Sequence, residues 1–393
     1  MEPRAIDRLE LEDRRVLIRC DFNVPLTPEG EVADDTRIVA ALPTIRHCLN
    51  RDARVVLMSH LGRPKGQFDP KLSLEPVGLK LAELLDREIL LTDDCVGDGA
   101  RKVVRDLRAG QVALLENLRF HAEEKKNEES FARKLAAHGE VFLQEAFGTL
   151  HRAHASVAGV PRFIQDKGAG FLVRKELEFL GRALDEPKRP FVAILGGAKV
   201  SDKIGVIEAL QAKANAILIG GAMAYTFLLA RGEPVGDSLV ERDKVELAER
   251  LLKGAAARGV NLVLPTDHVV ATEATDEAET RVESDGVPDG FKGLDIGPRT
   301  VAAFKAEVDA ARTVFWNGPM GLFEKKPFSE GTFALARLLA ESKAVSVVGG
   351  GDSASAVRQA GVADRVTHIS TGGGASLEFV QGKALPGLTA LVD

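Results

Sequence analysis

Residues 191–203 read FVAILGGAKVSDK, and this stretch contains the pattern that decides the fold. The five apolar residues Phe191–Leu195 favour a buried β-strand, because the run is short and ends at glycine. The pair Gly196-Gly197 then favours a tight turn into a helix. Glycines at a helix start leave bare N–H groups that phosphate oxygens can approach, at the positive end of the helix dipole. The stretch therefore predicts a strand whose carboxyl end binds an anion.

The same alternation of strand and helix recurs along the whole chain. Short apolar runs are followed by amphipathic stretches of helical length, such as Leu74–Leu85 and Val240–Arg258. This order predicts parallel sheets covered by helices on both faces. The expected fold class is α/β, with two Rossmann-like three-layer domains joined by a hinge helix. Besides Phe191–Leu195, the runs expected to form strands are Val16–Cys20, Val55–Met58, Val112–Leu115, Val141–Leu143, Ala216–Ile219, Leu262–Leu264, Val314–Trp316, Val345–Val348 and Thr367–Ile369.

Chain length and turn residues predict two domains. The chain has 393 residues, more than one ordinary core accommodates. Gly168-Ala169-Gly170 predicts a flexible entry to a connecting helix, and Pro187 and Pro190 follow that helix. We expect an N-terminal domain over residues 1–169, a connecting helix and hinge over 170–187, and a C-terminal domain over 188–379.

Composition excludes several classes of protein. The net charge of −6 argues against a nucleic-acid binder, which should carry a basic domain or stripe. Cys20, Cys48 and Cys95 lack a metal-ligand spacing, and we expect reduced thiols. No secretory signal is visible at the N-terminus, and Gly220-Gly221 interrupts the uncharged stretch 214–230, which favours a strand, a turn and a buried helix over a membrane span. We expect a cytoplasmic protein without nucleic-acid or membrane partners.

Basic residues follow four predicted strand ends in the first half. Ligands of open parallel sheets bind beyond these carboxyl ends, and arginine forks match phosphate and carboxylate oxygens. One such arginine alone is best explained as a surface charge, but four loops together predict a small, multiply anionic ligand. The histidines there lack a compact metal-ligand spacing, so we expect them to form hydrogen bonds. The basic residues are Arg37, His60, Arg63, Arg119, His151, Arg152 and His154.

Three glycine-rich helix starts in the second half, at 196–197, 349–351 and 372–374, predict phosphate binding. Asp352 is a candidate Mg²⁺ ligand beside them. None of the loops matches the P-loop pattern. Gly349-x-Gly351-x-x-Ala354 matches a dinucleotide fingerprint, but the next predicted strand does not end in the acid that this fingerprint requires. A nicotinamide-dependent dehydrogenase and a non-catalytic binding protein therefore remain weaker alternatives.

These motifs, in their order along the chain, resemble the phosphoglycerate kinase family over essentially the whole sequence. The resemblance implies a glycolytic phosphotransferase with a carboxyl group as acceptor. It would transfer a phosphoryl group reversibly between 1,3-bisphosphoglycerate and ADP, giving 3-phosphoglycerate and ATP. It further implies Mg²⁺ bound with the nucleotide, a monomer, and a C-terminal tail (380–393) that returns to the first domain. The matching segments are 19–25, 59–66, 116–120, 146–156, 196–203, 316–319, 349–352 and 370–376.

The resemblance also assigns site residues. It implies substrate-binding roles for Asp21, Phe22, Asn23, Arg37, His60, Leu61, Gly62, Arg63, Arg119 and Arg152. It implies nucleotide-binding roles for Gly197, Lys199, Lys203, Gly221, Gly293, Asn317, Pro319, Glu324, Gly350, Gly351, Asp352 and Ser353, with Asp352 also the metal ligand. The expected catalytic groups are Arg37, Lys199 and the amides of Gly373 and Gly374. We expect in-line transfer after domain closure, without a general base, because the acceptor oxygen is already anionic.

The sequence departs from the family's usual pattern in three places. Gln144-Glu145 stand where the family usually has Asn-Asp, Leu150 replaces an alanine, and Ser353 replaces a threonine but keeps its hydroxyl. We expect the first two departures to affect local packing rather than chemistry.

Overall fold

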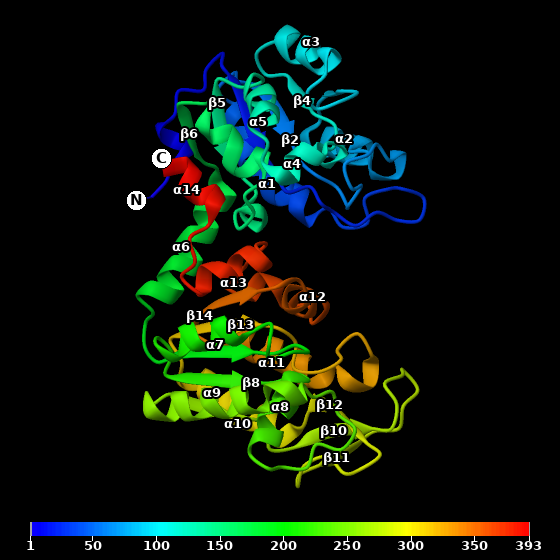
Figure 1. Ribbon diagram of the computed structural model, residues 1–393, viewed down its shortest axis with the longest axis vertical. Helices are drawn as coiled ribbons and strands as arrows, with labels where there is room; N and C mark the ends of the chain where they lie inside the picture. The colour runs from blue at the N-terminus through cyan, green and yellow to red at the C-terminus, as the bar shows by residue number, and fades with distance from the viewer. Residues whose placement is uncertain (1, 393) are drawn as a thin grey trace. The chain divides into compact units, whose positions relative to one another are not determined.

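The structure is a computed structural model that describes residues 2–392. Within this range the chain forms two compact units, residues 2–177 with 384–392 and residues 178–383. Figure 1 shows a sheet flanked by helices in each unit. Helix α6 (Phe171–Asp185) contains the boundary between the units.

The first unit is built on one parallel sheet in the order β3-β4-β2-β1-β5-β6. Its strands are β1 (Arg15–Arg19), β2 (Arg54–Met58), β3 (Ile89–Leu91), β4 (Val112–Leu114), β5 (Val141–Gln144) and β6 (Asp166–Ala169). Its helices are α1 (Thr36–Leu49), α2 (Glu75–Leu85), α3 (Asp98–Asp106), α4 (Ala122–Lys126), α5 (Glu129–Ala136) and α14 (Pro386–Val392). Short 3₁₀ turns cover Ile6–Arg8, Pro70–Leu72, Leu118–Phe120, Phe147–Thr149 and Val160–Arg162, and a π-helical turn covers Ala155–Gly159.

The second unit has a parallel sheet in the order β15-β14-β13-β7-β8-β9 and a small antiparallel sheet in the order β11-β10-β12. The parallel strands are β7 (Phe191–Leu195), β8 (Ala216–Ile219), β9 (Asn261–Val263), β13 (Thr313–Asn317), β14 (Val345–Gly349) and β15 (His368–Ile369). The antiparallel strands are β10 (His268–Ala271), β11 (Arg281–Glu283) and β12 (Lys292–Ile296). The helices are α7 (Ile204–Gln211), α8 (Met223–Ala230), α9 (Val245–Ala257), α10 (Pro298–Ala310), α11 (Glu330–Glu341), α12 (Gly351–Gln359) and α13 (Gly374–Val380), with 3₁₀ turns at Arg242–Lys244, Lys326–Phe328 and Ala363–Arg365.

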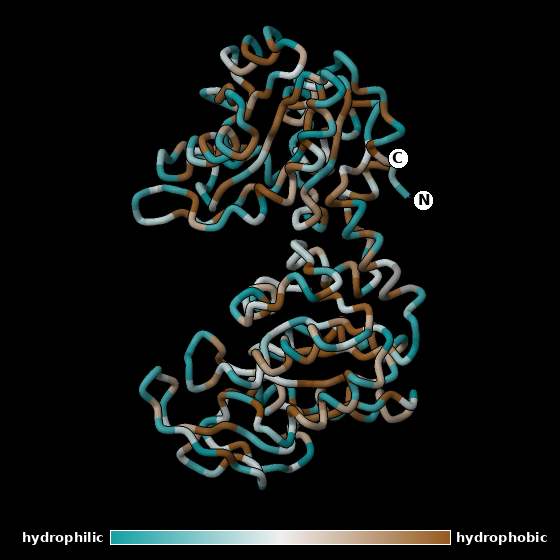
Figure 2. Tube along the Cα trace, turned by 180° about the vertical axis from the view of Figure 1, so that it is seen from behind, coloured by the Kyte–Doolittle hydropathy of each residue, from teal (hydrophilic) through white to brown (hydrophobic). Residues whose placement is uncertain are grey.

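Each parallel sheet has its own hydrophobic core. The central strands of both parallel sheets are almost entirely buried, and Figure 2 shows hydrophobic segments in the interior of each unit. Trp316 on β13 is fully buried in the second core, as are Val16 and Ile18 on β1 in the first. Strands that are covered on both faces read as continuous apolar runs, which is why the sequence predicted the central strands within one residue of their bounds. The α/β fold class with two parallel-sheet domains is confirmed.

Five strands were not predicted from the sequence, namely β3, β6 and the antiparallel β10, β11 and β12. The two parallel ones lie at the edges of their sheet, where less burial is required. Strand β6 includes Gly168, which we had expected in a flexible linker. A Cβ at Gly168 would lie 2.5 Å from the carbonyl oxygen of Arg4, and one at Gly170 would lie 2.0 Å from Oε2 of Glu145. Close packing therefore explains these glycines, and the hinge remains a prediction.

The expectation for residues 214–230 and for the cysteines agrees with the structure. Strand β8, a turn at Gly221 and the buried helix α8 occupy the uncharged stretch. Cys20, Cys48 and Cys95 are all free and buried. None of the helices described between residues 2 and 392 has the length and apolar composition needed to cross a membrane.

The C-terminal helix α14 packs in the first unit (Figure 1). The amide of Gly387 donates to the carbonyl oxygen of Leu150 at 2.9 Å. A Cβ at Gly387 would lie 2.8 Å from Cδ2 of Leu150 and 2.5 Å from Cγ1 of Val157. The fully buried Leu150 side chain thus fills space against this helix, which gives the departure at position 150 a packing role.

Candidate active site

In the first unit, the loops after β1 and β2 are joined by side-chain hydrogen bonds. Nη1 of Arg37, in the first turn of α1, donates to Oδ2 of Asp21 at 2.5 Å. The amide of Gly62 donates to Oδ1 of Asn23 at 2.8 Å. Gly62 has a φ of +60°, a left-handed conformation that glycine adopts without strain. The two strand-end loops are therefore held together at the carboxyl edge of the sheet.

Arg19, the last residue of β1, is 1% exposed and lies beneath these loops. Its Nη2 is 3.1 Å from Nδ1 of His60, and its Nε donates to Oγ of Ser156 at 2.8 Å. Burial, together with the positive charges of Arg19 and Arg119, holds the pKa of His60 well below its usual value. His60 is therefore neutral at pH 7 and serves as a hydrogen-bonding group, as the sequence predicted.

Arg119 lies in the same group of cations. Its Nη1 donates to the carbonyl oxygen of Gly62 at 2.7 Å. Its Nη2 is buried and has no hydrogen-bond partner among residues 2–392. Burial and the charges of Arg152 and Arg19 lower the pKa of Arg119 to about 10. A bound anion would complete the guanidinium's hydrogen bonds and offset the repulsion. We refer to Arg19, Arg37, His60, Arg119 and Arg152 as the arginine cluster.

The other predicted residues of the first unit differ in what they can offer. The side chains of Phe22 and Leu61 are buried in the hydrophobic core, so only their backbone is available to a ligand. Arg63 is exposed, and Nε of Arg152 donates to Nε2 of His151 at 3.2 Å. Burial and the neighbouring arginines lower the pKa of His154 to about 4. Sequence reasoning brought the loops together correctly but did not single out Arg19, which lies inside a strand rather than after it.

Behind the arginine cluster lies a buried carboxylate that the sequence analysis also missed. Glu124 accepts hydrogen bonds from Oγ of Ser156 at 2.6 Å and from its amide at 2.9 Å. Burial raises the pKa of Glu124, against the lowering effect of Arg19. Because Ser156 also accepts from Arg19, Glu124 fixes the orientation of the arginine through that serine.

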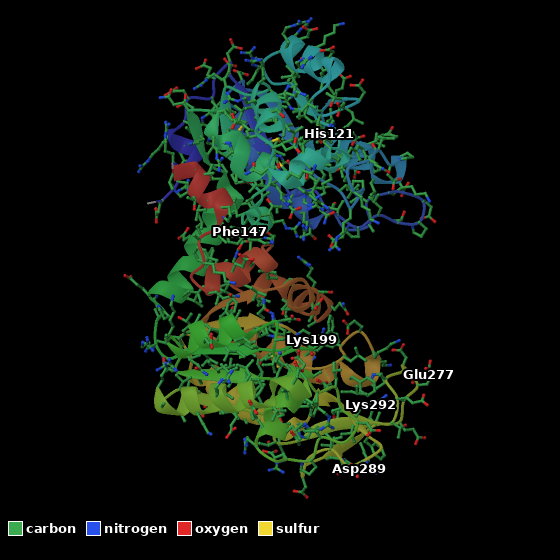
Figure 3. All side chains as sticks on the ribbon, viewed as in Figure 1. His121, Phe147, Lys199, Glu277, Asp289 and Lys292 are labelled. Carbon is green, nitrogen blue, oxygen red and sulfur yellow. The ribbon has the colours of Figure 1, made fainter. Side chains whose placement is uncertain are left out.

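The second unit contains a cavity of about 630 Å³. We call it the glycine-lined cavity. Six predicted nucleotide-binding residues line it, namely Gly197, Gly221, Gly293, Pro319, Glu324 and Asp352. Lining residues that the sequence analysis did not assign include Tyr225, Asp237, Ser238, Leu239, Lys292 and Asp295. Figure 3 marks Lys199 on the loop after β7 and Lys292 on β12 in this unit.

Glycine is required where the strand-end loops of this cavity touch. The amide of Gly197 donates to the carbonyl oxygen of Pro319 at 3.0 Å, and the amide of Gly221 donates to that of Met320 at 2.9 Å. A Cβ at Gly196 would lie 2.1 Å from the Pro319 oxygen. The turns after β7, β8 and β13 therefore approach closely and present backbone rather than side chains to a ligand.

A flat surface forms another part of the cavity, where Gly293 packs on Tyr225. A Cβ at Gly293 would lie 1.9 Å from the Tyr225 hydroxyl oxygen. The amide of Gly293 donates to Oγ of Ser238 at 2.9 Å, and the Tyr225 hydroxyl lies 3.3 Å from Nδ1 of His268. The half-exposed side chain of Leu239 also lines the space. A planar ring fits between such surfaces.

The remaining predicted nucleotide residues lie close to the cavity without lining it. Nζ of Lys203 donates to Oδ1 of Asn317, and Nδ2 of Asn317 is buried without a partner among residues 2–392. Burial lowers the pKa of Lys203, while the charges of Asp202 and Asp352 act in the opposite direction. Lys199 is exposed. An orphaned amide beside a lysine indicates a place for a ligand's acceptor atoms.

The N-termini of helices α12 and α13 carry the remaining predicted residues of the second unit. Helix α12 begins at Gly351, after Gly350 with a φ of +93°, and carries the exposed Asp352 in its first turn. Oγ of Ser353 accepts from the amide of Gly318 at 2.6 Å, which ties α12 to the loop after β13. Helix α13 begins at Gly374 after Gly373, which has a φ of +50°. Asp352 offers the hard carboxylate oxygen that Mg²⁺ prefers, next to amides that suit phosphate.

Comparison with known proteins gives one consistent family. A family model described as phosphoglycerate kinase matches residues 6–383. A phosphoglycerate kinase from Anaeromyxobacter sp. (strain K) is 62% identical, with 99% of each chain covered, and one from Chlorobium phaeobacteroides (strain BS1) is 53% identical, with 100% of each covered. The structure of phosphoglycerate kinase from Coxiella burnetii aligns with a TM-score of 0.90 at 40% identity, covering 99% of each chain. The structure from Pyrococcus horikoshii OT3 aligns with a TM-score of 0.87 at 34% identity, covering 99% of this chain and 98% of that one.

The sequence had left two alternatives open, a nicotinamide-dependent dehydrogenase and a non-catalytic binding protein. The full-length matches exclude both. They agree with the presence of the arginine cluster in one unit and the glycine-lined cavity in the other. The chain belongs to the phosphoglycerate kinase family, and it is a phosphotransferase that moves a phosphoryl group reversibly between 1,3-bisphosphoglycerate and ADP in glycolysis.

Proposed function

We propose that the arginine cluster binds 3-phosphoglycerate and that the glycine-lined cavity binds ADP or ATP. The single observation that carries the first assignment is the buried Nη2 of Arg119, which has no hydrogen-bond partner among the described residues and lies among cations that repel one another. A ligand with a phosphate and a carboxylate supplies acceptors for several guanidinium groups at once. Asp21 and Asn23 position the loops, and Asn23 does so through the amide of Gly62.

In the nucleotide half, the base would lie on the flat surface of Gly293 and Tyr225, and Glu324 at the cavity wall would hold the ribose. The phosphates would lie near the amides that begin α12 at Gly351. Lys203 and the orphaned Nδ2 of Asn317 support this placement, because each offers a donor to phosphate oxygens. Asp352 is the residue that would hold Mg²⁺, and the ion, when bound, would neutralise phosphate charge.

Transfer then consists of positioning and charge neutralisation. A carboxylate oxygen of 3-phosphoglycerate attacks the terminal phosphorus of ATP, and the bond from that phosphorus to the bridging oxygen of ADP breaks. Arg37 and Lys199 would neutralise the transferring group, and the amides of Gly373 and Gly374 would add hydrogen bonds. No proton moves in this step, so neutral His60 needs only to donate or accept a hydrogen bond.

Because the two ligand-binding sites belong to different units, we further propose that the units close on one another by a hinge movement around α6. One chain carries both sites, which supports a monomer. Three buried, free cysteines support a reducing compartment, the cytoplasm.

A coupled assay with 3-phosphoglycerate and MgATP tests these roles. We expect Arg37→Ala and Lys199→Ala each to lower kcat by roughly 10²–10³. Arg312→Ala is the matched control, because Arg312 belongs to neither proposed site, and this variant should keep the wild-type kcat. Unchanged kcat in both site variants would refute the assignment of these two residues.

A further inference from the structure

Asp94, Cys95 and His121 form a compact group of potential metal ligands outside both proposed ligand sites. Within the described residues, one ligand atom from each lies within 4.8 Å of the others. Asp94 and Cys95 occupy the loop between β3 and α3, and His121 follows the 3₁₀ turn Leu118–Phe120. Figure 3 marks His121 in the first unit. The phosphoryl-transfer mechanism uses none of the three.

The donor types of this group suit zinc. A thiolate, an imidazole and a carboxylate are its usual protein ligands, at roughly 2.0–2.3 Å from the ion, so tetrahedral ligand atoms lie about 3.5 Å apart. At present Oδ1 of Asp94 lies 2.6 Å from Nε2 of His121 in a hydrogen bond. Coordination would replace this hydrogen bond and lengthen the distance.

The group is buried at one end and open at the other. Cys95 is fully buried, whereas the side chains of Asp94 and His121 are 36% and 27% exposed. An ion can therefore enter between the carboxylate and the imidazole, with the thiol beneath. The open side leaves room for a water molecule as fourth ligand, the arrangement of a three-residue zinc site.

Buried groups hold the ligand loop in place. Oγ1 of Thr92 donates to the carbonyl oxygen of Asp94 at 2.6 Å. Nε2 of His138, which is 1% exposed, lies 2.9 Å from the carbonyl oxygen of Cys95 and so carries the proton of that hydrogen bond. Such contacts around the ligands restrict the loop before any ion binds, which lowers the entropy lost on binding.

Local charge favours a cation. Asp93 and Asp98 flank the ligand pair in sequence. Burial raises the pKa of the Cys95 thiol, so zinc must displace a proton when it binds.

We propose that Asp94, Cys95 and His121 bind one Zn²⁺ ion, with water as the fourth ligand. The site differs from the Mg²⁺ position at Asp352 in the nature of its donors, because Mg²⁺ is a hard ion that prefers oxygen ligands. His121 follows Arg119 by two residues, so the ion would also anchor the end of the loop that carries this arginine.

Isothermal titration of the metal-free full chain with ZnCl₂, in excess Mg²⁺ and without nucleotide, tests the proposal. We expect one ion per chain, with about one proton released as the thiol ionises. Cys95→Ser and His121→Gln should each weaken Zn²⁺ binding at least tenfold. Cys48→Ser, which removes another buried thiol, is the matched control and should bind as the wild type does.

Co²⁺ titration supplies a second readout, because thiolate coordination produces a charge-transfer absorption band. The band should appear in the wild type and in Cys48→Ser and be missing in Cys95→Ser. If Cys95→Ser does not fold, His121→Gln at the exposed rim decides the question. If the wild type does not bind Zn²⁺, or if His121→Gln binds it as tightly as the wild type does, the proposal is wrong.

Discussion

Arg119 shows how a single residue of the proposed substrate site trades stability for binding. Its guanidinium is largely buried, repelled by Arg19 and Arg152, and one of its nitrogens has no partner among residues 2–392. Relief of this repulsion and loss of the hydrogen bond to the Gly62 carbonyl oxygen act in opposite directions, so substitution by alanine should change the free energy of unfolding little. The same change removes charge-assisted hydrogen bonds worth about 1.5–3 kcal/mol to the ligand.

For Arg119→Ala we thus expect a KM for 3-phosphoglycerate that rises roughly 10- to 100-fold, from the same range of energies. Chemical denaturation measured alongside should show no loss of stability. Arg101→Ala is the control, because this arginine pairs with Asp98 at the surface of the same unit. A drop in stability with an unchanged KM would mean that Arg119 is structural.

Glu145 allows a residue-scale prediction about pH. It is fully buried, and Thr44 and the amide of Leu172 donate to it at the start of α6. Burial raises its pKa to about 7. The unfolded chain loses this proton near pH 4.3, so between pH 4.3 and 7 the folded state binds more protons. Stability from this group is fully present below pH 4.3 and is lost as the pH rises toward 7.

Glu145→Gln should remove that dependence. Relative to the variant, the wild type should lose stability between pH 5 and 8, by up to roughly 3 kcal/mol for a shift of this size. Urea denaturation of both proteins at pH 5, 6, 7 and 8 measures the difference. Parallel curves for the two proteins would show that Glu145 does not titrate in this window.

At the scale of elements, helices α6 and α14 each contain a glycine. The space around Gly181 in α6 is open, whereas Gly387 in α14 is tightly packed. An ideal Cβ at Gly181 in α6 meets nothing within 4 Å, so packing does not explain this residue. Alanine is favoured over glycine in a helix by about 0.8–1 kcal/mol. Gly181→Ala should stabilise the protein by about that amount and, if α6 bends during closure, should lower kcat. Stability is read by denaturation and kcat by the coupled assay; a stabilised variant with unchanged kcat would place the hinge elsewhere.

Gly387→Ala in α14 should have the reverse effect on stability. Its Cβ would overlap Val157 and Leu150, and overpacking of this kind costs about 1–3 kcal/mol. Leu150→Ala, which restores the residue usual in the family, should recover part of the loss in the double variant. Denaturation of the two single variants and the double variant measures this coupling. Additive effects of the two changes would contradict the contact.

Some strands of the fold could be predicted from the sequence and others could not. Central strands such as β7 and β13 were predictable because burial on both faces requires continuous apolar runs. Edge strand β6 was not, because its residues Asp166-Lys167-Gly168 have the composition of a linker. Residues that follow strand ends were identified, whereas Arg19 inside β1 and Tyr225 on α8 were not. Only the fold shows that these two side chains face a site.

In the whole molecule, the two proposed ligand-binding sites belong to two different units. Lys199→Ala should then lose turnover and weaken only the nucleotide, while it keeps its affinity for 3-phosphoglycerate, because a variant within one site should weaken one ligand. This expectation distinguishes a divided active site from one in which a single unit binds everything.

The most direct measurement is isothermal titration of Arg119→Ala and Asp352→Asn, each with 3-phosphoglycerate and separately with MgADP. We predict that Arg119→Ala weakens the binding of 3-phosphoglycerate at least tenfold and leaves the binding of MgADP unchanged. Asp352→Asn should weaken the binding of MgADP and leave that of 3-phosphoglycerate unchanged. If either variant weakened both ligands equally while remaining as stably folded as the wild type, the division of the site between the two units would be wrong.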